Sequence, residues 1–279
     1  MDAHPDFGRL RAQGTQGARA RTLHLAAALL MVCALAGTLQ AAPHRATDGS
    51  LHSVRLDQFA SSYPADTTPA GWHYFSFSPL PNPGSRSTYR FVVGNGDDQG
   101  YIHLRSSGRA GFGLASEQAF DLSKRPVLAW EWRAIEVPRG GDVRVPDRDD
   151  QAGSMCVVMN PRWLHPDAVL CYLWQDAGSR GAWGTADRDR THRFIILRTA
   201  ADPLGIWMRE RRDIAADWLQ AFGYEPSGKA VVAITIDSND TDSDAEADYR
   251  NIRVETQVAT ALADSKSSAR TTTRPNPSP

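Results

Sequence analysis

The sequence lacks the signatures of the common catalytic classes. It contains no Gly-x-Ser-x-Gly nucleophile elbow, no His-Glu-x-x-His metal-binding helix and no phosphate-binding P-loop. Cysteine is scarce, with three in 279 residues, and no pair of histidines stands beside Cys156 or Cys171. These two cysteines therefore make a poor zinc site. The sequence motifs therefore indicate no particular reaction.

The sequence also lacks an excess of charge of one sign. Its 31 basic and 32 acidic residues give a formal net charge of −1. Proteins that bind nucleic acids carry a strongly basic patch or stripe, because they must neutralise phosphates. We therefore expect no nucleic-acid partner.

Long hydrophobic runs are missing except for one, Leu23–Leu39, which follows Arg19 and Arg21 and closes on Ala41-Ala42. Its length is that of a signal-peptide hydrophobic region and is short for a membrane span, and the small residues suit signal peptidase. The pattern predicts a cleaved signal peptide over residues 1–42, a periplasmic or secreted bacterial protein, and no stable membrane span after processing. An uncleaved N-terminal anchor is the alternative.

Short runs of strand-forming residues recur through the chain, with turn residues between them. Strands are predicted at Trp72–Phe77, Tyr89–Val93, Tyr101–Arg105, Val127–Val137, Ser154–Asn160, Ala168–Trp174, Phe194–Leu197, Gly205–Arg211, Ala230–Ile236 and Asp248–Val254. One helix is predicted, because Asp213 can cap it, Ile214, Trp218 and Phe222 repeat at helical spacing, and Gly223 can end it.

This pattern predicts an all-β fold, a single β-sandwich over residues 53–255 with one short helix. Residues 43–52 are interpreted as a loose leader. Residues 256–279 are rich in Ser, Thr, Ala and Pro without apolar periodicity, and we interpret them as a disordered tail.

Cys156 and Cys171 stand in two strand-like runs joined by a proline-containing loop. If the runs form a hairpin centred on Leu164, the cysteines lie nearly opposite each other, close enough for a disulfide. An oxidising compartment would favour the bond, and two packed thiols are the alternative.

An acidic segment is the candidate for a hard cation. Alternate carboxylates of Asp237, Asp240, Asp242 and Asp244 can surround calcium with oxygen, although the spacing is not that of an EF-hand. Apart from this candidate calcium site, the sequence predicts no cofactor. The alternative is a solvated polar loop between the last two strands.

Glu131 and Glu210 are the candidate catalytic residues, each in the middle of a predicted strand. Two carboxylates that face each other across a groove can act as acid and base in glycoside cleavage. The alternative is that each carboxylate pairs with an arginine, for example Glu131 with Arg133 or Arg211, which is the commoner use of such residues.

Eight tryptophans are many for this length. Trp72, Trp130, Trp132, Trp207 and Trp218 are expected in the core. Trp163 and Trp183 stand in loops rich in Gly, Pro and Arg, where an exposed ring can stack on a sugar while Arg180 and Asp187 orient its hydroxyls. Plain packing is the alternative for both.

Several segments together resemble a secreted bacterial family known as domain of unknown function 3047. They are Arg125–Arg133, Asp149-Asp150 ahead of Met155–Met159, Tyr172–Trp174, Trp207–Asp213, Asp217–Gly223, Ile234–Asp240 and Ala247–Ile252. The resemblance spans about residues 54–255 and implies one β-sandwich domain, with a closing strand similar to that of galactose-binding-like jelly rolls. Where the family has an Ala-Arg-Val step, this chain has Gly153-Ser154-Met155.

The sequence is compatible with three functions. The first is an exported, non-catalytic module that binds a glycan or another envelope polymer. The second is a structural or protein-interaction domain of the envelope. The third is a glycan-active hydrolase or lyase that uses Glu131 and Glu210.

Overall fold

The structure is a computed structural model that describes residues 53–58, 63–76, 85–94, 99–124, 126–159, 168–185 and 191–256. The predicted signal peptide, the leader and the tail after residue 256 lie outside the described residues. Within the described part of the chain, no helix combines the length and the apolar character needed to cross a membrane.

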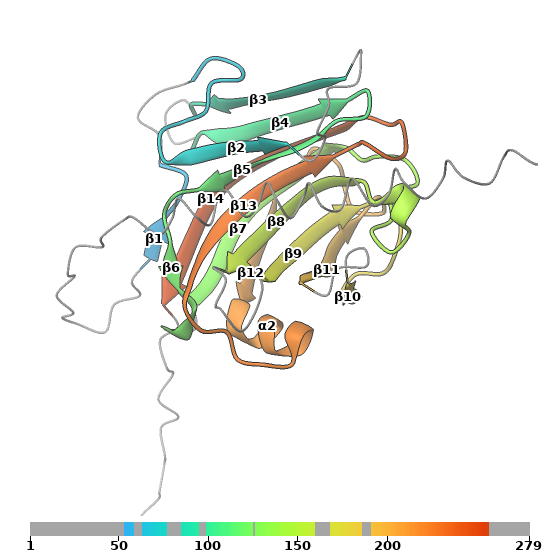
Figure 1. Cartoon of the computed structure of the whole chain (residues 1–279). Coiled ribbons are helices and arrows are strands. Elements are labelled where there is room, and N and C mark those ends of the chain that lie inside the picture. The colour runs from blue at the N-terminus through green and yellow to red at the C-terminus, as the bar shows by residue number, and fades with distance from the viewer. Residues whose placement is uncertain are drawn as a thin grey trace, which may run out of the picture.

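Two β-sheets stack face to face (Figure 1). Sheet A has the order β12 (Met208–Asp213), β7 (Pro126–Glu136), β14 (Ala245–Thr256), β4 (Tyr101–Ser107) and β3 (Arg86–Val92), with β1 (Ser53–Arg55) beside β14. Sheet B has the order β10 (Trp183–Thr185), β11 (His192–Thr199), β9 (Ala168–Gln175), β8 (Gln151–Met159), β13 (Lys229–Asp237), β5 (Gly111–Ser116) and β2 (Trp72–Ser76), with β6 (Phe120–Asp121) beside β13. The predicted all-β sandwich is confirmed.

The helical elements are short. They are η1 (Leu122–Lys124), η2 (Pro146–Arg148) and α2 (Ile214–Phe222). The strand pairs are antiparallel except β9 and β11, which run parallel because the chain crosses from one to the other through β10.

Aromatic residues fill the space between the sheets. Alternation along β7 turns Trp130 and Trp132 inward, where each is 1% exposed. Their rings meet two rings from β9 of the opposite sheet, with centroids 5.4 Å apart for Trp130 and Tyr172 and 5.5 Å apart for Trp132 and Trp174. These contacts bury large rings from both sheets, so the centre of β7 is the centre of the core.

The predicted helix is confirmed as α2, which lies at one end of the sandwich (Figure 1). The Asp213 carboxylate accepts a hydrogen bond from the Ala216 N–H at 3.1 Å, and Gly223 ends the helix with φ of 78°. Trp218 is fully buried and closes this end of the core.

The sequence analysis missed four strands: β1, β5, β6 and β10. β1 and β6 have only three and two residues, which is too short for a sequence pattern. β5 contains Gly113, where a side chain would meet the Phe75 ring at 2.5 Å and the Ile234 carbonyl oxygen at 2.7 Å. Glycine here permits close packing of three strands, although it lowers strand propensity. β10 has only three residues and no apolar alternation. The strand expected from Gly205 begins at Met208 instead, because Gly205 is in a turn with φ of 72°.

Candidate functional site

The two cysteines are directly opposite each other in neighbouring strands of sheet B and form a disulfide, with the two sulfurs 2.07 Å apart. The bond joins β8 to β9. Cys156 packs with Val158, Val169 and Ala233 in a buried apolar cluster on the side of sheet B that faces away from sheet A. The disulfide therefore belongs to a packed part of the sheet.

Glu131 lies on the outer face of sheet A, in line with arginines from both neighbouring strands. Arg209 of β12 and Arg250 of β14 are its direct cross-strand partners, and both guanidinium groups donate hydrogen bonds to it, at 3.0 Å and 2.8 Å. Burial alone would raise the pKa of Glu131, but the hydrogen bonds from Arg250 and Arg209 keep it below its usual value. The carboxylate is therefore held ionised between two cations.

Glu210 faces the opposite way. It follows Arg209 along β12, so alternation directs its side chain to the inner face of sheet A. There its carboxylate accepts hydrogen bonds from the Arg198 guanidinium at 2.7 Å and from the Trp132 indole N–H at 3.2 Å. Glu131 and Glu210 are on opposite faces of one sheet, which corrects the expectation that they share a groove as an acid–base pair.

Trp207 was expected in the core, and the structure corrects this. It is half-buried just before β12. The guanidinium carbons of Arg250 and Arg133 lie 4.1 Å and 4.6 Å from its ring centroid, within cation–π range. Trp207 therefore packs with the charged outer face of sheet A.

The four aspartates of the expected calcium segment separate into two groups. Asp242 and Asp244 form ion pairs with Arg109 and Arg105, at 3.3 Å and 3.2 Å. Asp237 is buried, next to the turn that holds Asp240. Among the residues that the structure describes, no group of three or more His, Cys, Asp or Glu side chains is arranged to hold a metal ion.

Asp237 lies in an acidic and poorly solvated environment at the end of β13. Its pKa is raised well above its usual value, chiefly by burial and then by the carboxylates of Asp150, Asp149 and Asp240. Asp150 is itself fully buried, and its carboxylate accepts hydrogen bonds from the backbone N–H groups of Asp240 and Thr241. The cluster anchors the β13–β14 turn.

Because the pKa of Asp237 is raised, we expect Asp237→Asn to be a stabilising change at neutral pH. The folded protein keeps a proton on Asp237 at pH values where an unfolded aspartate, with a pKa of about 3.9, has lost it. The folded state then binds more protons, so this group lowers stability as the pH rises above about 4. We expect the free energy of unfolding of Asp237→Asn to equal that of the wild type near pH 4. At pH 7 it should be higher by on the order of 1 kcal/mol, as measured by urea unfolding.

Asp244→Asn is the matched control, because this partly exposed carboxylate has Arg105 as its partner. We expect a change of about 0–1 kcal/mol. A loss of stability in Asp237→Asn at pH 7, together with calcium stabilisation of the wild type alone, would contradict the prediction.

The structure describes part of the predicted sugar-binding set. Trp163 and Asp187 lie outside the described residues. Trp183 is on β10 and is 50% exposed, more than any other tryptophan that the structure describes. Arg180 precedes it and forms an ion pair with the buried Asp202.

Trp183 stands on a firmly held segment. β10 pairs with β11, and the Gly181 N–H donates to the Ile196 carbonyl at 2.7 Å just before the strand begins. Thr185 is two residues further along, so it shares a face with Trp183, and the Arg193 guanidinium donates a hydrogen bond to its hydroxyl. We call Trp183, Thr185 and Arg193 the β10 surface, an exposed indole ring beside two polar groups.

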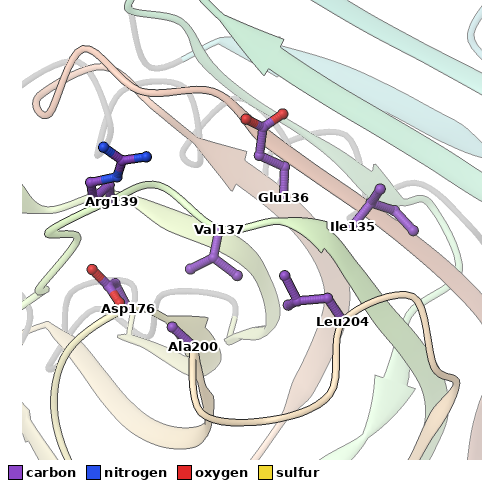
Figure 2. A pocket seen from close by; sticks show the side chains of 7 residues that line it. All are labelled: Ile135, Glu136, Val137, Arg139, Asp176, Ala200 and Leu204. Carbon is purple, nitrogen blue, oxygen red and sulfur yellow. The ribbon is translucent and has the colours of Figure 1, made fainter.

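A separate pocket of about 490 Å³ lies where β7 ends. It is lined by Ile135, Glu136, Val137, Arg139, Asp176, Ala200 and Leu204 (Figure 2). Sequence reasoning missed these residues, because they come from the end of β7 and from three separate connections, and follow no motif.

A family model described as "Protein of unknown function (DUF3047)" matches residues 70–253. The chain belongs to this family. The match covers nearly all of the two sheets and confirms the expected resemblance. No curated protein is detectably similar to the chain in sequence.

Several solved structures share the general β-sandwich arrangement at low identity. The family 11 carbohydrate-binding module of the cellulase Lic26A-Cel5E of Clostridium thermocellum is 10% identical, over 74% of this chain and 95% of that one, with a TM-score of 0.36. The xyloglucanase domain of NopAA from Sinorhizobium fredii is 14% identical, over 70% and 98%, with a TM-score of 0.36. The family 12 xyloglucanase from Bacillus licheniformis is 10% identical, over 75% and 100%, with a TM-score of 0.32. Likeness at this level transfers neither a ligand nor an activity to this member of the DUF3047 family.

Proposed function

We propose that this DUF3047 protein is an exported, non-catalytic module that binds a glycan through the β10 surface. The observation that supports it is the Trp183 ring, half exposed at the edge of sheet B and held there by backbone pairing. A planar apolar ring suits the C–H face of a sugar. The hydroxyl of Thr185 and the guanidinium of Arg193 share that face and can bind sugar hydroxyls.

Export is the second part of the proposal. It is supported by the apolar run Leu23–Leu39 after two arginines and by the disulfide, a bond that persists in oxidising compartments. The non-catalytic part is supported by Glu131 and Glu210, because each carboxylate is bound by arginine on its own face of sheet A. Release of reducing ends from any glycan that binds would overturn this part.

Trp183→Ala should weaken glycan binding at least tenfold, because the mutant loses the stacking ring at the centre of the proposed contact. The measurement is isothermal titration of residues 43–255 against soluble glucans, galactans and peptidoglycan fragments. Ile206→Ala is the matched control, because Ile206 is also an exposed apolar side chain, 57% accessible, and stands before β12. Equal affinity in both variants would refute the site, and a wild type that binds no glycan would favour a protein-interaction role.

A further inference from the structure

The pocket at the end of β7 is built from both sheets. Ile135 and Glu136 end β7 of sheet A, whereas Asp176 directly follows β9 of sheet B. Ala200 and Leu204 come from the connection between β11 and β12. Its volume of about 490 Å³ is within the range of small-molecule sites.

Backbone hydrogen bonds hold the walls of this pocket in place. The Gly205 N–H donates to the Ala134 carbonyl at 2.8 Å, which fixes the connection that carries Leu204. The Gly140 N–H donates to the Asp176 carboxylate at 2.5 Å, so the turn that carries Arg139 is tied to the end of β9. The pocket is therefore preformed, which lowers the entropic cost of binding.

One part of the pocket is aliphatic. Figure 2 shows Val137 near the middle, with Ile135 and Leu204 on one side of it. Leu204 is 48% exposed and Ile135 is 37% exposed, so a ligand side chain placed here would remove apolar surface from water. No aromatic ring lines the pocket, so it lacks the stacking platform that a sugar ring uses.

The other part of the pocket carries both signs of charge. Figure 2 places Arg139 and Asp176 on the side away from Leu204, whereas Glu136 stands apart from them, between Val137 and Ile135, with its carboxylate directed upward. Arg139 is exposed, and its guanidinium can donate hydrogen bonds to a ligand carboxylate. The carboxylates of Glu136 and Asp176 can accept hydrogen bonds from a ligand ammonium group.

We propose that this pocket binds a small zwitterion with an aliphatic side chain, as in leucine or a short leucine-containing peptide. The ligand carboxylate binds Arg139, and its ammonium group binds the Asp176 carboxylate on the same side of the pocket. Its side chain packs on Val137 and Leu204. This site is separate from the β10 surface and binds a different class of molecule.

The test is isothermal titration of the wild type and of Arg139→Gln with L-leucine and with Leu-Leu. We expect Arg139→Gln to weaken binding at least tenfold, because the variant loses the cation that meets the carboxylate. Arg90→Gln on β3 is the matched control, an exposed arginine at the opposite edge of sheet A, and it should bind as the wild type does. Leucinamide lacks the carboxylate and N-acetyl-leucine lacks the ammonium group, so both should bind at least tenfold more weakly than leucine.

The two probes also distinguish the source of the ligand. Binding of leucine supports a free amino acid, and binding of Leu-Leu alone supports a peptide. Absence of binding by both at about 1 mM, or equal binding by Arg139→Gln and the wild type, would overturn the proposal. Trp183→Ala should leave leucine binding unchanged, so failure of the glycan proposal and failure of this one are distinguishable.

Discussion

Asp217→Ala should strongly destabilise this protein. Asp217 is 7% exposed in the first turn of α2 and joins the helix to both sheets. Its carboxylate accepts a hydrogen bond from the hydroxyl of the fully buried Tyr172 at 2.8 Å. It also accepts two from the Arg212 guanidinium, at 2.8 Å and 2.5 Å.

Alanine would leave two groups without their partner. The Tyr172 hydroxyl would be buried and unsatisfied, and the Arg212 guanidinium would lose its counter-charge. Arg212 is 33% exposed and can turn partly to water, which reduces the cost. We expect a loss of about 2–4 kcal/mol in the free energy of unfolding. At about 2–4 °C per kcal/mol, the melting temperature should fall by about 4–16 °C.

Asp244→Ala is the control for this change. Asp244 also pairs with an arginine, but Asp244 and Arg105 are 36% and 45% exposed. An exposed pair contributes about 0–1 kcal/mol. Urea unfolding of both variants at pH 7 compares them directly. A similar small loss of unfolding free energy in the two variants would mean that water replaces the contacts of the Asp217 carboxylate.

Periodicity was sufficient to predict the parts of this fold where one face of an element is buried. Trp130 and Trp132 alternate with Glu131 and Arg133 in β7, and the structure places the tryptophans in the core. The helix was predictable in detail because its cap, its apolar stripe and its terminal glycine all stand within eleven residues. Local pattern and tertiary structure agree there.

Contacts between distant strands were not predictable in the same way. Glu131 and Glu210 both stand mid-strand, and only the register of β12 against β7 shows that they face opposite ways. Trp207 is aromatic and precedes a strand, which favours burial, but two arginines from β7 and β14 bind its ring outside the core. The pocket at the end of β7 likewise depends on how this strand end and three connections meet.

Removing the disulfide should lower the free energy of unfolding by nearly as much as Asp217→Ala does. Cys156 and Cys171 are 15 residues apart, and a cross-link that closes a loop of this length restricts the unfolded chain by about 3 kcal/mol. Cys156→Ala with Cys171→Ala should therefore lower the melting temperature by about 6–12 °C. Because Cys156 is 3% exposed, the lost packing adds to this effect.

Reduction separates the cross-link from the packing. Dithiothreitol should lower the melting temperature of the wild type but leave that of the double alanine variant unchanged, since that variant has no bond between these strands to reduce.

The same two cysteines test export, because the reducing cytosol keeps thiols free whereas the periplasm oxidises them. Expression from the full chain should yield protein with no free thiol at Cys156 or Cys171, and protein produced without residues 1–42 in the cytosol should yield two. Two free thiols in both preparations would contradict the export proposal. In the reduction experiment, an equal melting temperature of the wild type with and without the disulfide would show that the bond adds nothing to the stability of these strands.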